Sequence, residues 1–269
     1  MPCRPPDDAE RREGQGRRAA GGAPRSRRPG RISRLGRIGT WPAVALTVAV
    51  LVAANLVMHR WTGLSRLADL ATAVVVSALL LGVLRWAGGT RADAGLAPGT
   101  LARGTRWALV LIGLVAAVYL VGALLPPTRT LFEDRRYEGM SGSELTLRVL
   151  VLVPVGTVLV EEIAFRGVLY GLVLRARGTL WATTVSSLLF GLWHVLPSLH
   201  LATAKPALTA VFGDSALGGV LAVVAAVLFT AAAGVLFCEL RRRSGSLLAP
   251  MGLHWAVNAF GYVAGFLLR

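Results

Sequence analysis

The sequence is poor in cysteine and in charged residues, and both shortages limit the class of protein to which it can belong. Only Cys3 and Cys238 occur among 269 residues, one near the amino terminus and one at the end of an apolar run, so a disulfide is not expected. Charged residues make up 16% of the chain and hydrophobic residues 54%, and the charges fall in clusters between long uncharged runs. This composition predicts a chain whose solvent is a lipid bilayer.

Acidic residues are scarce as well, and the formal net charge is +15. Much of the excess lies in residues 1–39, where eleven arginines are mixed with Gly, Pro and four acidic residues. A segment with so few apolar residues cannot bury enough surface to fold, so we predict a disordered basic tail on the cytoplasmic side of a membrane. Arginines beside a membrane favour anionic lipid head groups, and we expect no nucleic-acid partner.

Apolar runs of about 20 residues, the length that crosses a bilayer, predict the architecture. We expect an all-α fold, a polytopic transmembrane helical bundle of seven to eight helices, within one domain at residues 40–269. Residues 167–174 fit an interfacial helix, an extension of the span before them or an eighth helix, and the connection 199–212 is the other source of an eighth. The seven runs lie at 41–58, 67–86, 107–125, 145–165, 180–196, 215–238 and 246–268.

Arginines in alternate loops give the predicted orientation, because basic loops favour the cytoplasmic side. The other loops hold few bases or offset them with acids. We therefore expect an integral membrane protein with a cytoplasmic N-terminus that contacts membrane lipids. The high Arg, Ala, Gly and Val content with one lysine is typical of a GC-rich bacterial genome, which suggests a bacterial cytoplasmic membrane. The arginines assigned to the inside are Arg85, Arg91, Arg103, Arg106, Arg166, Arg175, Arg177 and Arg241 to Arg243.

Polar residues interrupt the later spans. An ionisable side chain at membrane depth is costly unless it is paired or hydrated, so each one is a candidate functional residue. Glu161 and Glu162 come at the cytoplasmic end of the fourth span, and His194 comes near the external end of the fifth. His254 and Asn258 lie near the middle of the last span. The difference in depth between His194 and the glutamates would require a tilted or short fifth helix.

Helical spacing separates the two glutamates. Residues i and i+4 share a face, so Glu162 faces Arg166 and can pair with it, whereas Glu161 points about 100° away and is left to act as a general base. Phe190 shares a face with His194 in the same way. The simpler alternatives are that the glutamates anchor a helix end in the head-group layer and that each histidine is a satisfied core residue.

Together these side chains suit hydrolytic chemistry. A carboxylate and two imidazoles can polarise water or bind zinc, with Glu161, His194 and His254 as the candidate metal ligands, and the Asn258 amide can donate to an oxyanion. A metal-free Glu/His mechanism fits these residues equally well. No His-Glu-x-x-His, Gly-x-Ser-x-Gly or phosphate-binding glycine loop occurs in a suitable context, so zincins, serine hydrolases and P-loop enzymes are not supported.

Three ordered motifs resemble the CPBP family, the CAAX-protease and bacteriocin-processing (Abi) group of intramembrane proteases. They are Glu161-Glu162-Ile-Ala-Phe-Arg166, Phe190-Gly-Leu-Trp-His194 and His254-Trp-Ala-Val-Asn258, and they cover roughly the last 130 residues. The resemblance implies about eight helices around a cytoplasm-facing cavity in which a peptide bond of a hydrophobic or prenylated substrate is cleaved.

The roles that this resemblance implies can be carried over residue by residue. Glu161 would activate water with His194 as its partner, His254 and Asn258 would stabilise the oxyanion, and Glu162 with Arg166 would hold the first helix. The alternative is a non-catalytic membrane scaffold, a bacteriocin self-immunity protein or a regulator of the same fold, with the polar cluster joining helices. A proton-coupled transporter ranks last, because no internal repeat is evident.

Overall fold

The fold is entirely helical in residues 37–60 and 66–268, which with Met1 are the part of the chain that the computed structural model describes. The predicted all-α class is confirmed. The predicted disordered tail and Cys3 lie outside the described residues. The longer helices are α1 (Thr40–Arg60), α2 (Arg66–Trp86), α3 (Leu101–Leu124), α5 (Tyr170–Trp193), α9 (Ala216–Ser244) and α10 (Leu248–Leu267). The shorter ones are η2 (Pro98–Thr100), η3 (Pro126–Phe132), η4 (Arg135–Tyr137), α4 (Gly142–Leu147), η5 (Arg148–Leu159), η6 (Glu162–Leu169), α6 (Val195–Ser198), α7 (Leu201–Ala204) and α8 (Pro206–Phe212).

Four helical segments of the described chain are long and apolar enough to cross a membrane: 40–58, 66–86, 98–124 and 216–244. They correspond to four of the seven predicted spans. The remaining predicted spans are helical but interrupted or more polar. Winding changes within 142–169, a kink divides α5, and α10 carries two polar side chains, His254 and Asn258.

The segment that bears the glutamates continues further than predicted. Helical winding runs from Gly142 through the wide π turns of η5 and η6 into α5, and it breaks at Gly178, whose φ of 81° suits a residue without a side chain. Residues 167–174 therefore extend the preceding helix. The prediction that Glu161 and Glu162 mark the end of a span is wrong, because a further four turns of helix follow them. Arg166, assigned above to an inside loop, is likewise fully buried within the bundle.

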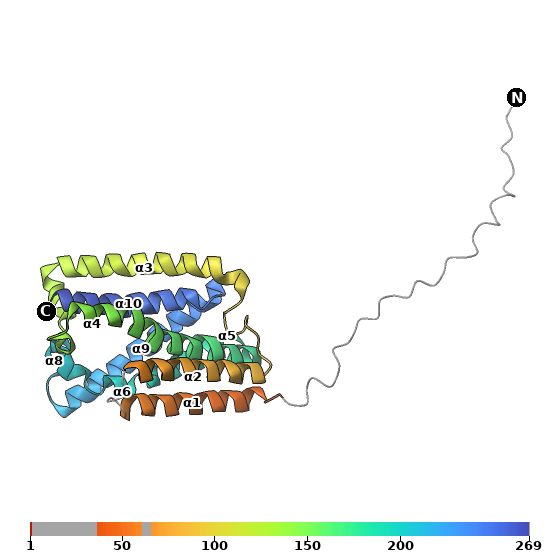
Figure 1. Ribbon diagram of the computed structural model, residues 1–269, viewed down its shortest axis with the longest axis horizontal. Helices are drawn as coiled ribbons and strands as arrows, with labels where there is room; N and C mark the ends of the chain where they lie inside the picture. The colour runs from red at the N-terminus through yellow and green to blue at the C-terminus, as the bar shows by residue number, and fades with distance from the viewer. Residues whose placement is uncertain (2–36, 61–65, 269) are drawn as a thin grey trace. The chain divides into compact units, whose positions relative to one another are not determined.

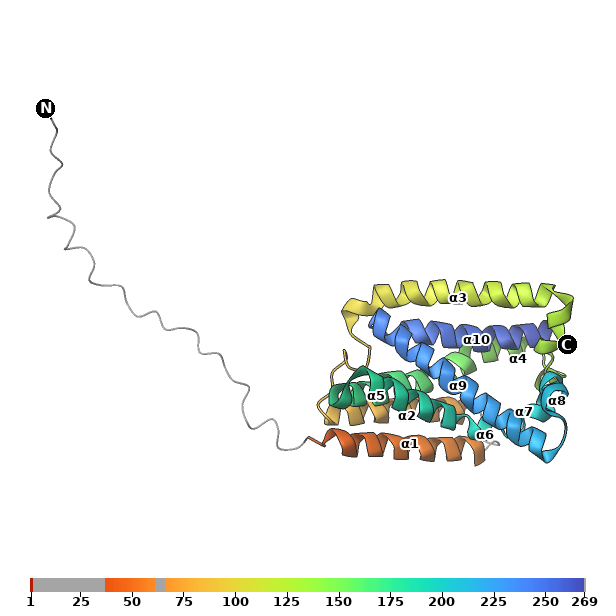
Figure 2. The same cartoon turned by 180° about the vertical axis from the view of Figure 1, so that it is seen from behind.

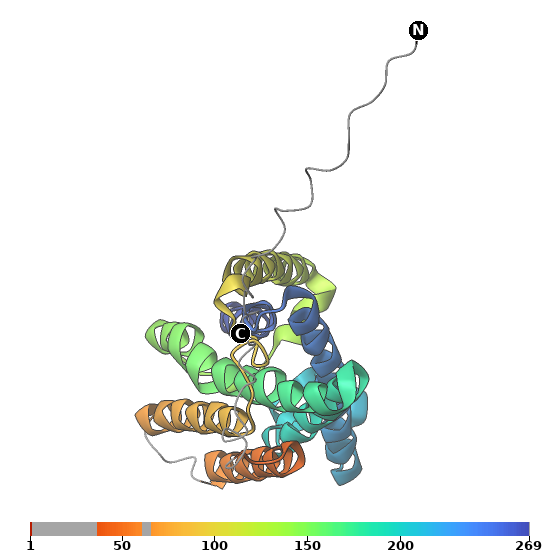
Figure 3. The same cartoon turned by 90° about the vertical axis from the view of Figure 1, so that its right-hand side faces the viewer.

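Two helix pairs enclose this central segment. α3 lies alongside α10, and α1 lies alongside α2, as Figures 1 and 2 both show. The end-on view in Figure 3 shows residues 142–177 between these pairs, in agreement with the contacts of η5 with both α2 and α10. The polar residues of this segment are therefore covered by neighbouring helices.

Glycines allow the closest helix contacts. A Cβ at Gly252 of α10 would stand 2.5 Å from the Cβ of Ala108 in α3, and one at Gly191 of α5 would stand 2.7 Å from the Val227 carbonyl oxygen in α9. Such approaches are typical of helices that pack in a membrane. The second contact matters for the site because α5 carries the His194 motif at its end.

Candidate functional site: a buried glutamate and histidine cluster

A cavity of about 780 Å³ lies inside the bundle. Three of the predicted catalytic residues, Glu161, His194 and Asn258, line it, and they come from three different helical segments. Its other lining residues are Met58, Arg136, Gly156, Thr157, Trp193, Pro197, Ser198, Leu201, Lys205, Leu208, Phe212, Ala222, Ala225, Ala226, Phe229 and Thr230. The structure thus brings together motifs that are almost 100 residues apart in the sequence.

The two carboxylate oxygens of Glu161 differ in their partners. Its Oε1 atom accepts a hydrogen bond from the indole Nε1 of Trp193 at 3.1 Å. Its Oε2 atom accepts no hydrogen bond from the residues that the structure describes and lies 3.7 Å from Nε2 of His254. The side chain is 8% exposed. A buried carboxylate oxygen without a protein donor is a natural acceptor for water.

Glu162 is held on both sides. Its Oε1 atom accepts hydrogen bonds from Nη1 of Arg166 at 3.1 Å and from Nδ1 of His254 at 2.8 Å. The Glu162 and Arg166 side chains are both completely buried. The predicted pairing of Glu162 with Arg166 is present, and His254 joins it as a second partner that helical spacing alone did not indicate.

The Arg166 guanidinium is packed between aromatic rings. Its Cζ atom lies 3.9 Å from the ring centroid of Phe190 and 4.7 Å from that of Phe237. Ring faces attract cations, and this attraction strengthens when water is absent. Phe190, predicted as a supporting residue through its place one turn before His194, therefore contacts both the cation and, at 4.7 Å between ring centroids, the His194 imidazole.

The tautomer of His194 follows from its partner. Nδ1 lies 2.8 Å from the Phe190 carbonyl oxygen, which can only accept, so Nδ1 carries the proton and donates. In the neutral imidazole Nε2 then keeps its lone pair. Asn258 uses one amide hydrogen in a bond from Nδ2 to the His254 carbonyl at 3.1 Å, and the second hydrogen is available to a molecule in the cavity.

His254 lies behind the cavity wall and is not among the residues that line it. It is 6% exposed and stacks on Phe237 with 5.2 Å between centroids and an interplanar angle of 25°. Its two ring nitrogens face Glu162 and Glu161 in turn. The position therefore suits contact with the two carboxylates better than direct contact with a substrate.

Sequence reasoning missed Trp193 and Phe237. A signal for Trp193 exists, because a tryptophan beside a motif histidine in an apolar span must find an acceptor for its N–H when it is buried. Phe237 lies in an uncharged run and resembles any other apolar residue there. Only the folded chain shows that it contacts both His254 and Arg166.

The cavity rim carries an ionic cluster that the sequence did not suggest either. Asp134, whose side chain is fully buried, binds Arg136 at 2.5 Å and Lys205 at 3.3 Å, and the two bases line the cavity. Burial would raise the pKa of Asp134, but hydrogen bonds and charge from Arg136, with a smaller contribution from Lys205, lower it below its ordinary 3.8. The cluster joins the segment after α3 to the α7–α8 connection.

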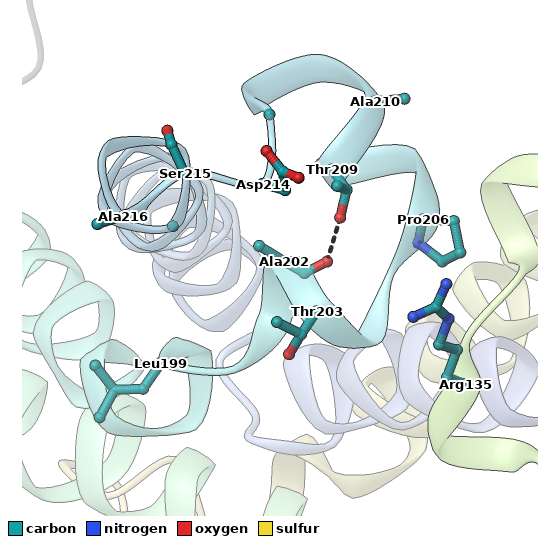
Figure 4. A pocket seen from close by; sticks show the side chains of 12 residues that line it. Arg135, Leu199, Ala202, Thr203, Pro206, Thr209, Ala210, Asp214, Ser215 and Ala216 are labelled. Carbon is teal, nitrogen blue, oxygen red and sulfur yellow. Dashed lines mark hydrogen bonds between the residues drawn. The ribbon is translucent and has the colours of Figure 1, made fainter.

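The α7–α8 connection separates the site from a second cavity of about 510 Å³, drawn in Figure 4. Arg135 and Asp214 supply charge to the lining of this second cavity. Thr209 Oγ1 donates to the Ala202 carbonyl at 2.7 Å and holds the two short helices together. None of the predicted site residues lines this cavity.

The candidate zinc ligands are Glu161, His194 and His254. In the described part of the chain no group of three His, Cys, Asp or Glu side chains is arranged to hold a metal ion. Catalytic zinc needs three protein ligands, and here only Glu161 and His254 approach each other, at 3.7 Å. Nδ1 of His254 bonds a carboxylate as a zinc-bound histidine often does, but His194 is not part of that pair.

The fold and the cavity define a helical membrane protein with a buried polar site of carboxylates, imidazoles and an amide. Residues 143–260 match the family model described as type II CAAX prenyl endopeptidase Rce1-like, and all three motifs fall inside the matched range. This segment is therefore similar to the Rce1-like CAAX proteases, which confirms the resemblance to the CPBP group. No curated protein and no solved structure matches the chain.

Proposed function

We propose that the protein is an intramembrane endopeptidase that cleaves a peptide bond of a membrane-associated or hydrophobic substrate. One observation carries the proposal: Glu161, His194 and Asn258 come from separate helices and line one cavity, within a domain of a protease family. The protein acts in a bacterial cytoplasmic membrane among lipids.

Glu161 serves as the general base. A water molecule hydrogen-bonded to Oε2 gives its proton to that atom while its oxygen forms a bond to the substrate carbonyl carbon. The carbonyl π electrons move to the carbonyl oxygen. When the tetrahedral intermediate collapses, the C–N bond breaks and the same proton passes to the leaving nitrogen, so Glu161 returns to its starting state.

Four side chains position this reaction. His194 accepts from the attacking water at Nε2, because its Nδ1 proton is held by the Phe190 carbonyl. Asn258 donates its second amide hydrogen to the developing oxyanion. Trp193 orients the Glu161 carboxylate through a hydrogen bond to Oε1, and the His254 ring lies 3.7 Å from Oε2. The role in oxyanion binding that the resemblance implies for His254 passes in this proposal to Asn258 alone.

Activity of the purified protein in detergent tests the proposal. The probes are internally quenched peptides that end in a CAAX sequence, one with a prenylated cysteine and one without the lipid. Wild-type protein should cleave at least one probe, and His194→Ala should abolish cleavage. His200→Ala is the matched control, because His200 is exposed and lines neither cavity. Equal activity in the two variants would end the proposal, and complete inactivity of folded wild-type protein towards both probes would favour the scaffold alternative.

Zinc is tested separately. Metal analysis of the purified protein, and cleavage after treatment with a chelator, show whether a metal ion takes part. Since only two candidate ligands approach each other, we expect sub-stoichiometric zinc and activity that survives the chelator. One zinc per chain with chelator-sensitive cleavage would require His194 to move toward Glu161 and His254.

A further inference from the structure

The two ends of the bundle differ in charge, and the cavity is lined by residues from only one of them. α1, α3 and α10 run the length of the unit, so each end can be identified by where these helices begin and end (Figure 1). The cavity lining includes Met58 near the end of α1, Arg136 from the segment after α3, and residues of α7 and α8. These all lie at the end where α3 and α10 finish.

The opposite end is strongly basic. Here Arg241 donates to the Ala92 carbonyl at 2.9 Å and Arg103 donates to the Ser244 carbonyl at 2.6 Å, so the α2–α3 connection packs on the end of α9. Only Asp93 and Glu239 supply negative charge to this end in the described chain. We call it the basic end, and its arginines are Arg37, Arg85, Arg91, Arg103, Arg106, Arg175, Arg177, Arg241, Arg242 and Arg243.

The cavity end is electrically balanced. Arg66 pairs with Glu144 at 3.0 Å, and Lys205 and Arg136 share Asp134. Among the residues whose side chains the structure describes, bases and acids occur there in equal number. We call it the mixed end; its bases are Arg66, Arg129, Arg135, Arg136, Arg148 and Lys205, and its acids are Asp69, Glu133, Asp134, Glu138, Glu144 and Asp214.

Short loops rich in arginine remain on the cytoplasmic side, whereas acidic residues have little influence on orientation. The cavity end has fewer bases, most of them paired, so the charge rule places the basic end in the cytoplasm. α1 begins at the basic end. If the basic end lies in the cytoplasm, the start of α1 is therefore cytoplasmic and the cavity end lies on the opposite side of the membrane. A cytoplasm-facing cavity, which the family resemblance implies, would put ten described arginines of the basic end outside.

We propose that the cavity opens on the non-cytoplasmic face of the membrane and that the substrate is an exported or outer-leaflet polypeptide segment. That the cavity receives a substrate rests on the proposed function, whereas the side of the membrane on which the cavity opens does not depend on it. Two rim bases share one buried carboxylate, which leaves one positive charge at the entrance and favours a substrate that carries an anionic group there.

Two glycines provide matched reporters. Gly99 lies in η2 at the basic end, and Gly142 begins α4 at the mixed end. Both are exposed, neither has a positive φ, and a Cβ at either would meet no atom within 4 Å. Gly99→Cys and Gly142→Cys are made in a full-length chain carrying Cys3→Ser and Cys238→Ala, and intact cells are treated with a membrane-impermeant maleimide. Ala225→Cys is a third reporter on the cavity wall.

Gly142→Cys and Ala225→Cys should be labelled severalfold more strongly in intact cells than Gly99→Cys, and Gly99→Cys should reach the same labelling once the membrane is permeabilised. Labelling of Gly99→Cys but not of Gly142→Cys in intact cells would overturn the proposal, and so would equal labelling of both. The labelling needs no catalysis, so a protein without protease activity can still show this orientation, and an active protease can still contradict it.

Discussion

The two neighbouring glutamates teach how one turn of helix produces two different environments. Glu161 faces the cavity, with one oxygen bound to Trp193 and the other buried without a hydrogen-bond donor among the described residues. Glu162 faces the closed side, where Arg166 and His254 both donate to it and no surface is exposed. Adjacent residues diverge by about 100° on a helix, so one carboxylate can serve the reaction while the next holds the bundle together. The His254 ring lies between the two glutamates and approaches both carboxylates.

The largest expected effect is on the cavity side. Glu161→Gln keeps the shape of the side chain but removes the base, and activity should fall by about 10²–10⁴-fold, the usual contribution of general-base catalysis. Cleavage rates of the quenched peptides and thermal unfolding in detergent measure the two consequences. Glu144→Gln is the control, because Glu144 is not among the residues that line the cavity and pairs with Arg66. A Glu161→Gln protein that remains fully active would remove the contrast between the two glutamates.

Changes at Glu162, on the side that faces away from the cavity, should lower the stability of the protein. Glu162→Ala strands the buried Arg166 and releases His254, and breaking a buried pair costs about 3–5 kcal/mol. We expect a large drop in Tm in detergent, accompanied by lower activity because His254 loses its anchor. A double variant, Glu162→Ala with Arg166→Leu, removes the stranded charge and should recover part of the lost Tm. Unchanged Tm in the single variant would show that the pair is not structural.

Trp193→Phe tests the hydrogen bond that positions Glu161. Losing a hydrogen bond to a charged group costs about 1.5–3 kcal/mol, so kcat should fall by roughly 10- to 150-fold while KM changes little. Trp255→Phe is the matched control, since the Trp255 indole donates to the Val149 carbonyl outside the cavity lining. Equal losses of kcat in the two variants would point to a general packing effect.

The smallest effect concerns the rim. The folded pKa of Asp134 lies below its ordinary value, so its ion pairs stabilise the protein above about pH 4 and this stabilisation is lost as the pH falls through the folded pKa. Its partners are partly exposed, and we expect less than about 1 kcal/mol. A carboxylate titrates between about pH 5 and about pH 3. Over this range the Tm of wild type should fall more steeply than that of Asp134→Asn. Parallel curves would contradict the assignment.

Much of the architecture could be predicted because long apolar runs have few alternatives in a membrane. The long apolar helices α1, α2, α3 and α9 follow from those runs, and the three motifs followed from polar residues that interrupt the later runs. The depth of Glu161 and Glu162 could not be predicted, because the charged residues Arg166 and Arg175 soon after them resemble those that mark the end of a membrane span. The structure shows that Arg166 is instead neutralised by Glu162 and covered by aromatic rings.

The partners of the motif residues were also beyond the sequence. Spacing along one helix predicts the Glu162–Arg166 pair but gives no information about contacts between helices. The bond from His254 to Glu162 joins residues 92 positions apart, and it changes the role expected of His254. Phe237 had no polar neighbour in its run to mark it. Zinc binding, which the residue types left open beside a metal-free mechanism, stays a prediction that metal analysis can test.

The hydrogen bond from Asn55 Nδ2 to the Trp193 carbonyl, 3.1 Å long, has a consequence for engineering the protein. Asn55 belongs to α1, and Met58 of the same helix lines the cavity, yet both precede the recognisable segment 143–260. The residues that form and support the cavity thus extend beyond the segment that the family model matches. A shortened gene that encodes only the matched segment would lose the Asn55 hydrogen bond and the Met58 side chain of the cavity lining, so grafts and chimaeras should include α1.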